Sequence, residues 1–207
     1  PLWKDIRMLD ITGGEPFLAD VASTVHQLIT ENIQAIYITT NGVLTSSILE
    51  QTEKILGCGN HFHLFIGISL DGPEEIHDRL RGIKGTYRRV MVSMQELTGV
   101  RKTQPRLHLS IKYTVMPENW QHIQETFHCA QSMGFGFTAK PYLVSGILGN
   151  TREVQFSQEQ IHSIEAQFRE INKAAKNQVN KPFQLWRSVS RHADRLFHRE
   201  LIRYLHK

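Results

Sequence analysis

The feature that most constrains this chain is a regular alternation between short apolar runs and longer segments with helical spacing. Five runs have the length and composition of strands, and each precedes a segment whose apolar residues recur every three or four positions. Such alternation is typical of βα units, whose strands lie parallel and whose crossovers are right-handed. We therefore expect a parallel α/β sheet that curls toward a barrel or a doubly wound fold. The expected strands cover 6–12, 35–39, 64–70, 107–115 and 137–143.

The helical segments predict how the chain is divided. No internal repeat and no linker rich in Pro, Gly or Ser interrupts the 207 residues, so we expect one domain. Its core covers 1–150, and the C-terminal helices of 151–207 pack on the barrel. Four of the expected helices cover 17–30, 44–56, 74–81 and 185–207. A further helix begins at about residue 86 and stops at Gly99, and another is capped by Asn119 and ended by Gly134. The last one follows a capping box formed by Ser157 and Gln160.

Composition excludes several classes of protein. No run approaches 18 consecutive apolar residues, and no signal-peptide pattern is present, so we expect neither a membrane span nor secretion. The two cysteines, Cys58 and Cys129, form no CxxC pair and no metal-ligand spacing. We interpret them as reduced thiols of a cytoplasmic protein, and we predict no metal ligand in this sequence.

The positive charge of the chain is concentrated at its end. Lys and Arg number 24 against 20 Asp and Glu, which gives a net charge of +4. Residues 181–207 contain seven of the basic residues and two of the acidic ones. A nucleic-acid-binding protein usually spreads basic residues over its main surface, so this distribution argues against such a partner. We interpret 185–207 as a helix that packs one side on the barrel; its basic side faces solvent or docks an acidic peptide or another domain.

Glycines and polar residues follow each of the first three expected strands. Ligands of parallel α/β sheets bind at the carboxyl ends of the strands, so these residues are candidates for one site. Each group taken alone is typical of a turn, and only their joint occurrence favours a function. The candidates are Gly13, Gly14 and Glu15 after the first strand, Thr40 and Asn41 after the second, Ser69 and Asp71 after the third, and Arg81 a few residues further on.

The chemistry of these candidates outlines a ligand. Glu15 and the bare carbonyls of the glycine pair suit an ammonium group, and Arg81 offers a planar pair of donors to a carboxylate. Ser69 and Asp71 can accept hydrogen bonds from the vicinal hydroxyls of a ribose. The sequence contains neither GxGxxG nor GxxxxGK, which argues against a dinucleotide or a nucleoside triphosphate. A compound that joins an amino acid to a ribose would satisfy all three groups.

Three motifs resemble one known family. They are ITGGEP at 11–16, TTNG at 39–42 and SLDGPEEIHDRLRG at 69–82, and their order and spacing are similar to those of the radical S-adenosylmethionine (SAM) superfamily. The resemblance is dense over 8–90 and weaker to about 145. The most similar branch contains the anaerobic sulfatase-maturating enzymes and other peptide-modifying, SPASM-type members.

The resemblance implies an oxidoreductase or maturase with a partial (β/α) barrel. In this family SAM chelates the unique iron of a 4Fe-4S cluster, and reductive cleavage yields a 5′-deoxyadenosyl radical that abstracts hydrogen from a peptide or protein substrate. The implied electron donor is a reductant such as flavodoxin or ferredoxin. By similarity, Gly13, Gly14 and Glu15 bind the methionyl ammonium, Arg81 holds the carboxylate, and Ser69 and Asp71 lie near the ribose or the carboxylate. Thr40 and Asn41 are expected to line the cavity rather than to anchor the cofactor. We name no catalytic residue.

The sequence departs from the family in one respect. The family binds its cluster through a CxxxCxxC loop that precedes the GGEP strand, and no such loop occurs in these 207 residues. We expect the sequence to be part of a longer protein, lacking the first strand and the cluster loop, and inactive in radical chemistry by itself. The alternative is a non-catalytic, clusterless barrel that acts as a binding or docking module. An ordinary phosphate-binding barrel enzyme is a weaker alternative, because few glycines follow the late strands.

Overall fold

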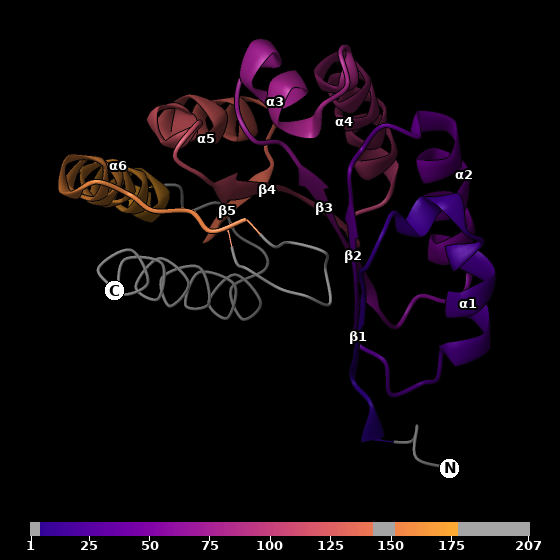
Figure 1. The fold of residues 1–207 in the computed structure, drawn as a ribbon. Helices are drawn as coiled ribbons and strands as arrows, with labels where there is room; N and C mark the ends of the chain where they lie inside the picture. Colours follow the sequence, from indigo (N-terminus) through magenta and orange to yellow (C-terminus); the bar gives the residue numbers. More distant parts are fainter. Residues whose placement is uncertain (1–4, 143–151, 178–207) are drawn as a thin grey trace.

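The structure, a computed structural model, describes residues 5–142 and 152–177. Its strands form one parallel sheet in the order β1-β2-β3-β4-β5, so spatial neighbours are also neighbours in the chain. The sheet curves, and the helices that follow its strands lie on one side of it (Figure 1). This arrangement confirms the predicted partial (β/α) barrel. The strands are β1 (Met8–Ile11), β2 (Ala35–Thr40), β3 (His63–Ser69), β4 (Leu107–Val115) and β5 (Gly136–Pro141).

The helices follow the predicted order, with two differences in their bounds. The expected helix over 17–30 is interrupted, because the Asp20 carboxylate accepts a hydrogen bond from the Ser23 N–H and starts a separate helix. Gly99 does not end its helix, which continues to Thr103. The helices are η2 (Pro16–Leu18), α1 (Val21–Leu28), α2 (Thr45–Gly57), α3 (Glu74–Arg81), α4 (Thr86–Thr103), η3 (Trp120–His122), α5 (Ile123–Ser132) and α6 (Gln158–Asn177).

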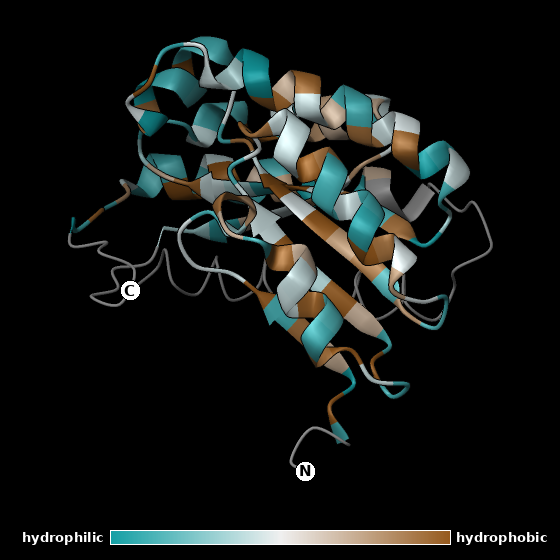
Figure 2. Cartoon of the chain, turned by 90° about the vertical axis from the view of Figure 1, so that its right-hand side faces the viewer, coloured by the Kyte–Doolittle hydropathy of each residue, from teal (hydrophilic) through white to brown (hydrophobic). Residues whose placement is uncertain are grey.

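The main core lies between the sheet and its helices. Alternate residues of each strand point to this side, as the period of a β-strand requires. Ile36, Ile66 and Ile111 are fully buried there and belong to the same cluster as Ile55 of α2 and Met94 of α4. Figure 2 shows the same arrangement as hydrophobic strands with hydrophilic residues on the outer sides of the helices. Burial of this apolar face holds the strand ends in register at the candidate site.

A second core cluster attaches α6 to the end of the sheet. Ile164 and Phe168 of α6 are buried together with Phe127 of α5 and Val115 of β4. The predicted capping box at the start of α6 is confirmed, because the Ser157 N–H donates to the side chain of Gln160 and the Gln160 N–H donates to the Ser157 hydroxyl. The division of the chain at residue 150 stays a prediction. The expected helix over 185–207 and most of the connection before α6 lie outside the described residues.

The other side of the sheet, called the inner face below, carries a row of stacked rings. Tyr37, Phe65 and His108 are register partners on three neighbouring strands. The Tyr37 and Phe65 ring centroids are 4.4 Å apart, and those of Phe65 and His108 are 4.5 Å apart. His108 Nε2 also lies 2.9 Å from His63 Nδ1. The row thus links β2, β3 and β4 below the carboxyl ends of the strands.

Candidate functional site

The carboxyl edge of the sheet carries the residues that the sequence singles out. Gly13 and Gly14 follow β1 after one residue, Thr40 and Ser69 are the last residues of β2 and β3, and Arg81 ends α3. Gly13 has a φ of +99° and Gly14 a φ of +52°, and a Cβ at either position would meet no atom within 4 Å. The glycine pair is therefore required by its backbone conformation and leaves open space beside the chain.

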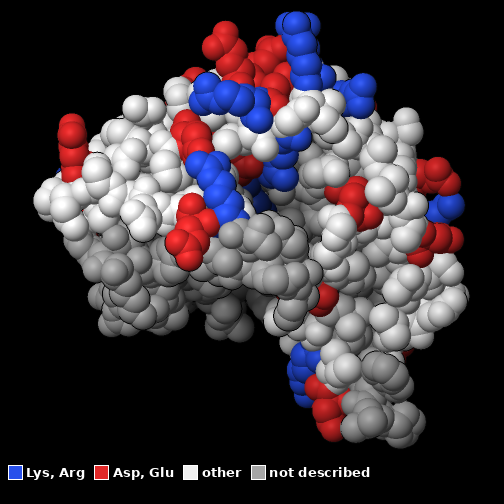
Figure 3. Space-filling view, viewed as in Figure 1, with Lys and Arg blue, Asp and Glu red and all other residues white. Residues whose placement is uncertain are grey.

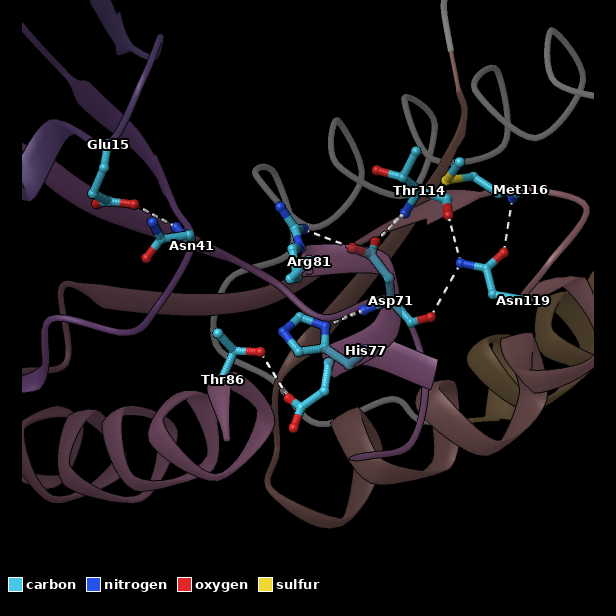
Figure 4. A network of polar contacts seen from close by, with 10 residues as sticks. Glu15, Asn41, Asp71, His77, Arg81, Thr86, Thr114, Met116 and Asn119 are labelled. Atoms are coloured by element: carbon cyan, nitrogen blue, oxygen red, sulfur yellow. Dashed lines mark hydrogen bonds and ion pairs between the residues drawn. The ribbon is translucent and has the colours of Figure 1, made fainter. Parts of the chain in front are cut away.

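Glu15 is held at this edge by the end of β2. Its Oε1 accepts a hydrogen bond from the Thr40 hydroxyl at 2.6 Å, and its Oε2 accepts one from the Asn41 N–H at 2.6 Å. The Phe17 N–H also donates to Oε1, at 3.3 Å. Thr40 is buried and Glu15 is half-buried, so the carboxylate is fixed yet partly open. The structure brings three predicted residues together, and Thr40 and Asn41 orient Glu15. Figure 4 shows Asn41 beside the Glu15 carboxylate.

Asp71 and Arg81 form an ion pair at the end of β3. Arg81 Nη2 donates to Asp71 Oδ2 at 2.6 Å, and the Thr114 N–H donates to Asp71 Oδ1 at 2.9 Å. The side chain of Asp71 is 6% exposed and that of Arg81 is 34% exposed. The sequence predicts two separate contacts with a ligand, whereas in the structure these two side chains contact each other. Both oxygens of Asp71 are engaged, and the guanidinium extends toward solvent.

Two buried polar residues that the sequence did not assign to the site surround Asp71. His77 Nδ1 accepts a hydrogen bond from the Asp71 N–H at 3.1 Å. The Asn119 amide donates to the carbonyls of Asp71 and Thr114, at 3.1 and 2.8 Å. The sequence predicts that Asn119 caps a helix, but its side chain accepts from the Met116 N–H instead and makes no capping bond. A buried histidine and asparagine beside a strand end are recognisable only once the strands are packed.

Burial decides the protonation of His77. Its pKa lies below the usual value because burial disfavours the charged imidazolium; the Asp71 carboxylate opposes this effect and Arg81 adds to it. His77 is 1% exposed. A neutral ring that accepts at Nδ1 carries its proton on Nε2, which fixes the tautomer.

Asp78 joins the two helices that follow β3. Its carboxylate accepts hydrogen bonds from the Gly85 N–H, the Tyr87 N–H and the Thr86 hydroxyl. These bonds lower the pKa of Asp78 to about 2, with the bond from Tyr87 contributing most. Asp78 therefore satisfies the first N–H groups of α4 and fixes the loop that follows Arg81.

Ser69 and Lys112 lie side by side on the inner face at the same edge. They are register partners on β3 and β4. The Ser69 hydroxyl makes no hydrogen bond within the part of the chain that the structure describes. The Lys112 side chain crosses Gly67, where an added Cβ would lie 2.6 Å from Lys112 Cε. Gly67 thus makes room for a lysine stem beside the candidate serine.

The described residues do not fit an iron–sulfur cluster. No group of three His, Cys, Asp or Glu that could hold a metal occurs among them. Cys58 directly follows α2 and Cys129 lies in α5, so neither thiol is at the carboxyl edge. Burial raises the pKa of both thiols, which disfavours the thiolate that iron requires. SAM itself is matched by the chemistry at the edge, which combines open backbone, a fixed carboxylate and a partly exposed guanidinium.

Charged side chains of both signs surround α3. Acidic and basic residues are interleaved over α3 and the start of α4 on the face that Figure 3 shows. This part of the surface therefore has neither a uniformly positive nor a uniformly negative electrostatic potential. Exposed pairs such as Arg88 with Glu74 contribute to this pattern. Within 5–142 and 152–177, no helix has the length and apolarity needed to cross a membrane.

Solved structures with this fold include SAM-binding proteins. SuiB of Streptococcus suis bound to S-adenosylmethionine matches with a TM-score of 0.55 and 19% identity, covering 82% of this chain and 36% of SuiB. Native anSMEcpe with bound AdoMet and the Kp18Cys peptide matches with a TM-score of 0.57 and 19% identity, covering 82% of this chain and 48% of anSMEcpe. At this identity the likeness concerns the fold.

Sequence comparison defines the class of protein. Residues 2–130 match the family described as the Radical SAM superfamily. The chain belongs to this superfamily, which confirms the prediction from the three motifs.

Curated relatives give two further matches. Pre-heme d1 synthase of Dinoroseobacter shibae is 26% identical over 146 residues, which are 70% of this chain and 33% of that protein. AdoMet-dependent heme synthase of Methanosarcina barkeri is 28% identical over 128 residues, which are 61% of this chain and 34% of that protein. This chain therefore spans about a third of the length of the curated relatives it matches.

Proposed function

We propose that this chain is the SAM-binding part of a radical SAM enzyme. The observation that carries the proposal is a fixed carboxylate, Glu15, and an anchored guanidinium, Arg81, at one edge of one sheet. The two charges suit the ammonium and carboxylate of the methionyl group. The carbonyls of Gly13 and Gly14 support the ammonium, and Ser69 faces the ribose or the carboxylate.

Thr40 and Asn41 act on SAM through Glu15. Both donate to its carboxylate, at 2.6 Å, and so prevent it from turning toward solvent. Hydrogen bonds to charged groups contribute about 1.5–3 kcal/mol each, which is enough to decide the orientation of a half-buried side chain. The ammonium therefore meets an acceptor that is already in place.

The reaction that we propose is the reductive cleavage of SAM to a 5′-deoxyadenosyl radical, which abstracts hydrogen from a peptide or protein. A peptide substrate is supported by anSMEcpe, whose structure contains the Kp18Cys peptide. We further propose that the enzyme is an oxidoreductase or maturase of the SPASM-type branch. Its reductant is a flavodoxin or ferredoxin, and its location is cytoplasmic. Because the described residues supply no cluster ligands, we assign no step of the electron transfer to them.

Two other functions have a specific observation in their favour. The lack of cluster ligands among the described residues supports a clusterless, non-catalytic module that binds SAM or docks a partner. The curated relatives are named for heme d1 and heme synthesis, which supports a tetrapyrrole as the substrate in place of a peptide. Formation of 5′-deoxyadenosine by the anaerobically reconstituted native protein separates the enzyme from the module.

Calorimetric titration of the chain with SAM tests the proposed site. Loss of a hydrogen bond to a charged group costs about 1.5–3 kcal/mol, so we expect Glu15→Ala and Arg81→Ala each to weaken binding about tenfold to a hundredfold. Glu74→Gln is the control, because Glu74 lies on α3 in an exposed pair with Arg88. Wild-type affinity in both alanine variants would refute the site.

A further inference from the structure

Three groups fix Asp71 in one position, and two of them belong to the buried residues His77 and Asn119. His77 accepts from its N–H, Asn119 donates to its carbonyl, and Thr114 donates to one of its carboxylate oxygens. Asp71, His77 and Asn119 are 4%, 1% and 0% exposed. The Tyr113 hydroxyl donates to the Asn119 carbonyl at 2.6 Å and fixes Asn119 in turn. Every polar group of Asp71 except Oδ2 is therefore bound by the surrounding framework.

The remaining oxygen of Asp71 determines where Arg81 points. Arg81 Nη2 donates to Oδ2 at 2.6 Å. Among the described residues, Asp71 is the hydrogen-bond partner of the Arg81 guanidinium. A guanidinium has five N–H donors in one plane, so one anchored nitrogen orients the others. Arg81 is the last residue of α3, and its side chain is one-third exposed. The anchored fork can therefore present further N–H groups to a carboxylate at the sheet edge.

We propose that Asp71, His77 and Asn119 are positioning residues that hold Arg81 in place for the carboxylate of SAM. This inference rests on the proposed function. It gives Asp71 a different role from the ribose contact that the sequence predicts. A sugar hydroxyl would have to reach a carboxylate that is almost fully buried and already engaged at both oxygens. Figure 4 shows Arg81 and the three positioning residues converging between the ends of β3 and β4.

If Asp71, His77 and Asn119 served only to stabilise the fold, their network would not require the partly exposed Arg81. The bonds of Asn119 to Asp71, Thr114 and Met116 already join β3 to β4 without Arg81. A buried carboxylate needs a charged partner or several donors, but that partner need not extend into solvent. The one-third exposure of Arg81 is the feature that a role in ligand binding explains.

Two ligands that differ by one group separate positioning from folding. SAM and decarboxylated SAM share the amine, sulfonium, ribose and adenine, and only SAM has the carboxylate. We expect Asp71→Asn to weaken SAM about tenfold in calorimetric titrations of the full chain and to leave decarboxylated SAM within about twofold. Glu15→Ala is the matched control, because it should weaken both ligands to the same extent.

Variants of the histidine test the network at a second point. In His77→Asn the amide oxygen can still accept from the Asp71 N–H, so preference for SAM over its decarboxylated analogue should be retained. In His77→Leu the acceptor is lost, and the preference should fall. Circular dichroism checks that each variant is folded, and the Asp71→Asn titration decides the positioning role if His77→Leu does not fold. Equal preference for SAM in folded His77→Leu and wild type would overturn the positioning role.

Arg81→Ala distinguishes failure of this inference from failure of the proposed function. If Arg81→Ala removes the preference for SAM and a second change, Asp71→Asn, adds nothing, both proposals are supported. If Arg81→Ala removes the preference but Asp71→Asn alone does not reduce it, the positioning role is wrong and the site stands. If Arg81→Ala leaves the preference intact, the assignment of Arg81 to the SAM carboxylate is itself wrong.

Discussion

Gly42→Ala is expected to be costly because Gly42 combines a left-handed backbone with tight packing. Its φ is +78°, and an added Cβ would lie 2.8 Å from Ile68 Cγ2 and 3.2 Å from Val90 Cγ2. The turn is also fixed by hydrogen bonds: the Gly42 N–H donates to the Thr40 hydroxyl, and the Ser93 hydroxyl donates to the Gly42 carbonyl. Neither the backbone nor the two core side chains can move without disturbing the other.

The cost of Gly42→Ala is the sum of two effects. A left-handed conformation costs a residue with a Cβ about 1–2 kcal/mol. Forcing a methyl group into a packed core costs a further 1–3 kcal/mol, roughly. We therefore expect the free energy of unfolding to fall by about 2–5 kcal/mol. Because the same turn carries Thr40 and Asn41, SAM affinity should fall as well.

Gly82→Ala isolates the backbone effect. Gly82 has a φ of +71°, close to that of Gly42, but an added Cβ there would meet no atom within 4 Å. We expect Gly82→Ala to cost about 1–2 kcal/mol, so urea titrations followed by circular dichroism should rank it well above Gly42→Ala in stability. Equal losses in the two variants would refute the argument that the methyl group collides with Ile68 and Val90.

Two further predictions concern stability. Ile164→Ala should lower the free energy of unfolding in urea by about 2–5 kcal/mol, because Ile164 is fully buried in the cluster that attaches α6, whereas Glu159→Ala on the same helix should change it little. Asp78→Asn should lower the thermal midpoint at pH 7. The folded pKa of Asp78 is about 2 against an ordinary 3.8, so its stabilisation is complete above about pH 4 and is lost as the pH falls through 2. The difference between wild type and Asp78→Asn should therefore shrink between pH 4 and pH 2, and a constant difference would contradict the role of Asp78.

The order of the strands and helices could be predicted because it depends on local patterns. Apolar runs and 3–4 spacing are properties of short segments, and the resulting βα alternation allows few topologies. The errors occurred where a single residue decides between two local structures. Asp20 lies within a segment of helical spacing, yet it caps a new helix. Gly99 is a residue typical of helix ends, yet it lies within α4.

The candidate site could be predicted only as far as each residue follows a strand. Glu15, Thr40 and Asn41 were placed at neighbouring strand ends, and the structure joins them directly. His77 and Asn119 could not be assigned to the site, because their contacts with Asp71 depend on how α3 and β4 pack after β3. Sequence position shows which residues reach the edge, whereas packing decides which of them hold one another.

The sequential order of the strands has a consequence for how the protein is made. Each strand pairs with strands that immediately precede and follow it in the chain, so each closure of a chain loop spans a single βα unit. Such loops have a modest entropic cost, and the sheet can grow by one edge as each unit leaves the ribosome. The nascent protein can thus assemble in the direction of translation, with Glu15 and its partners at the end of β2 meeting before the strand that supports Asn119 has been synthesised.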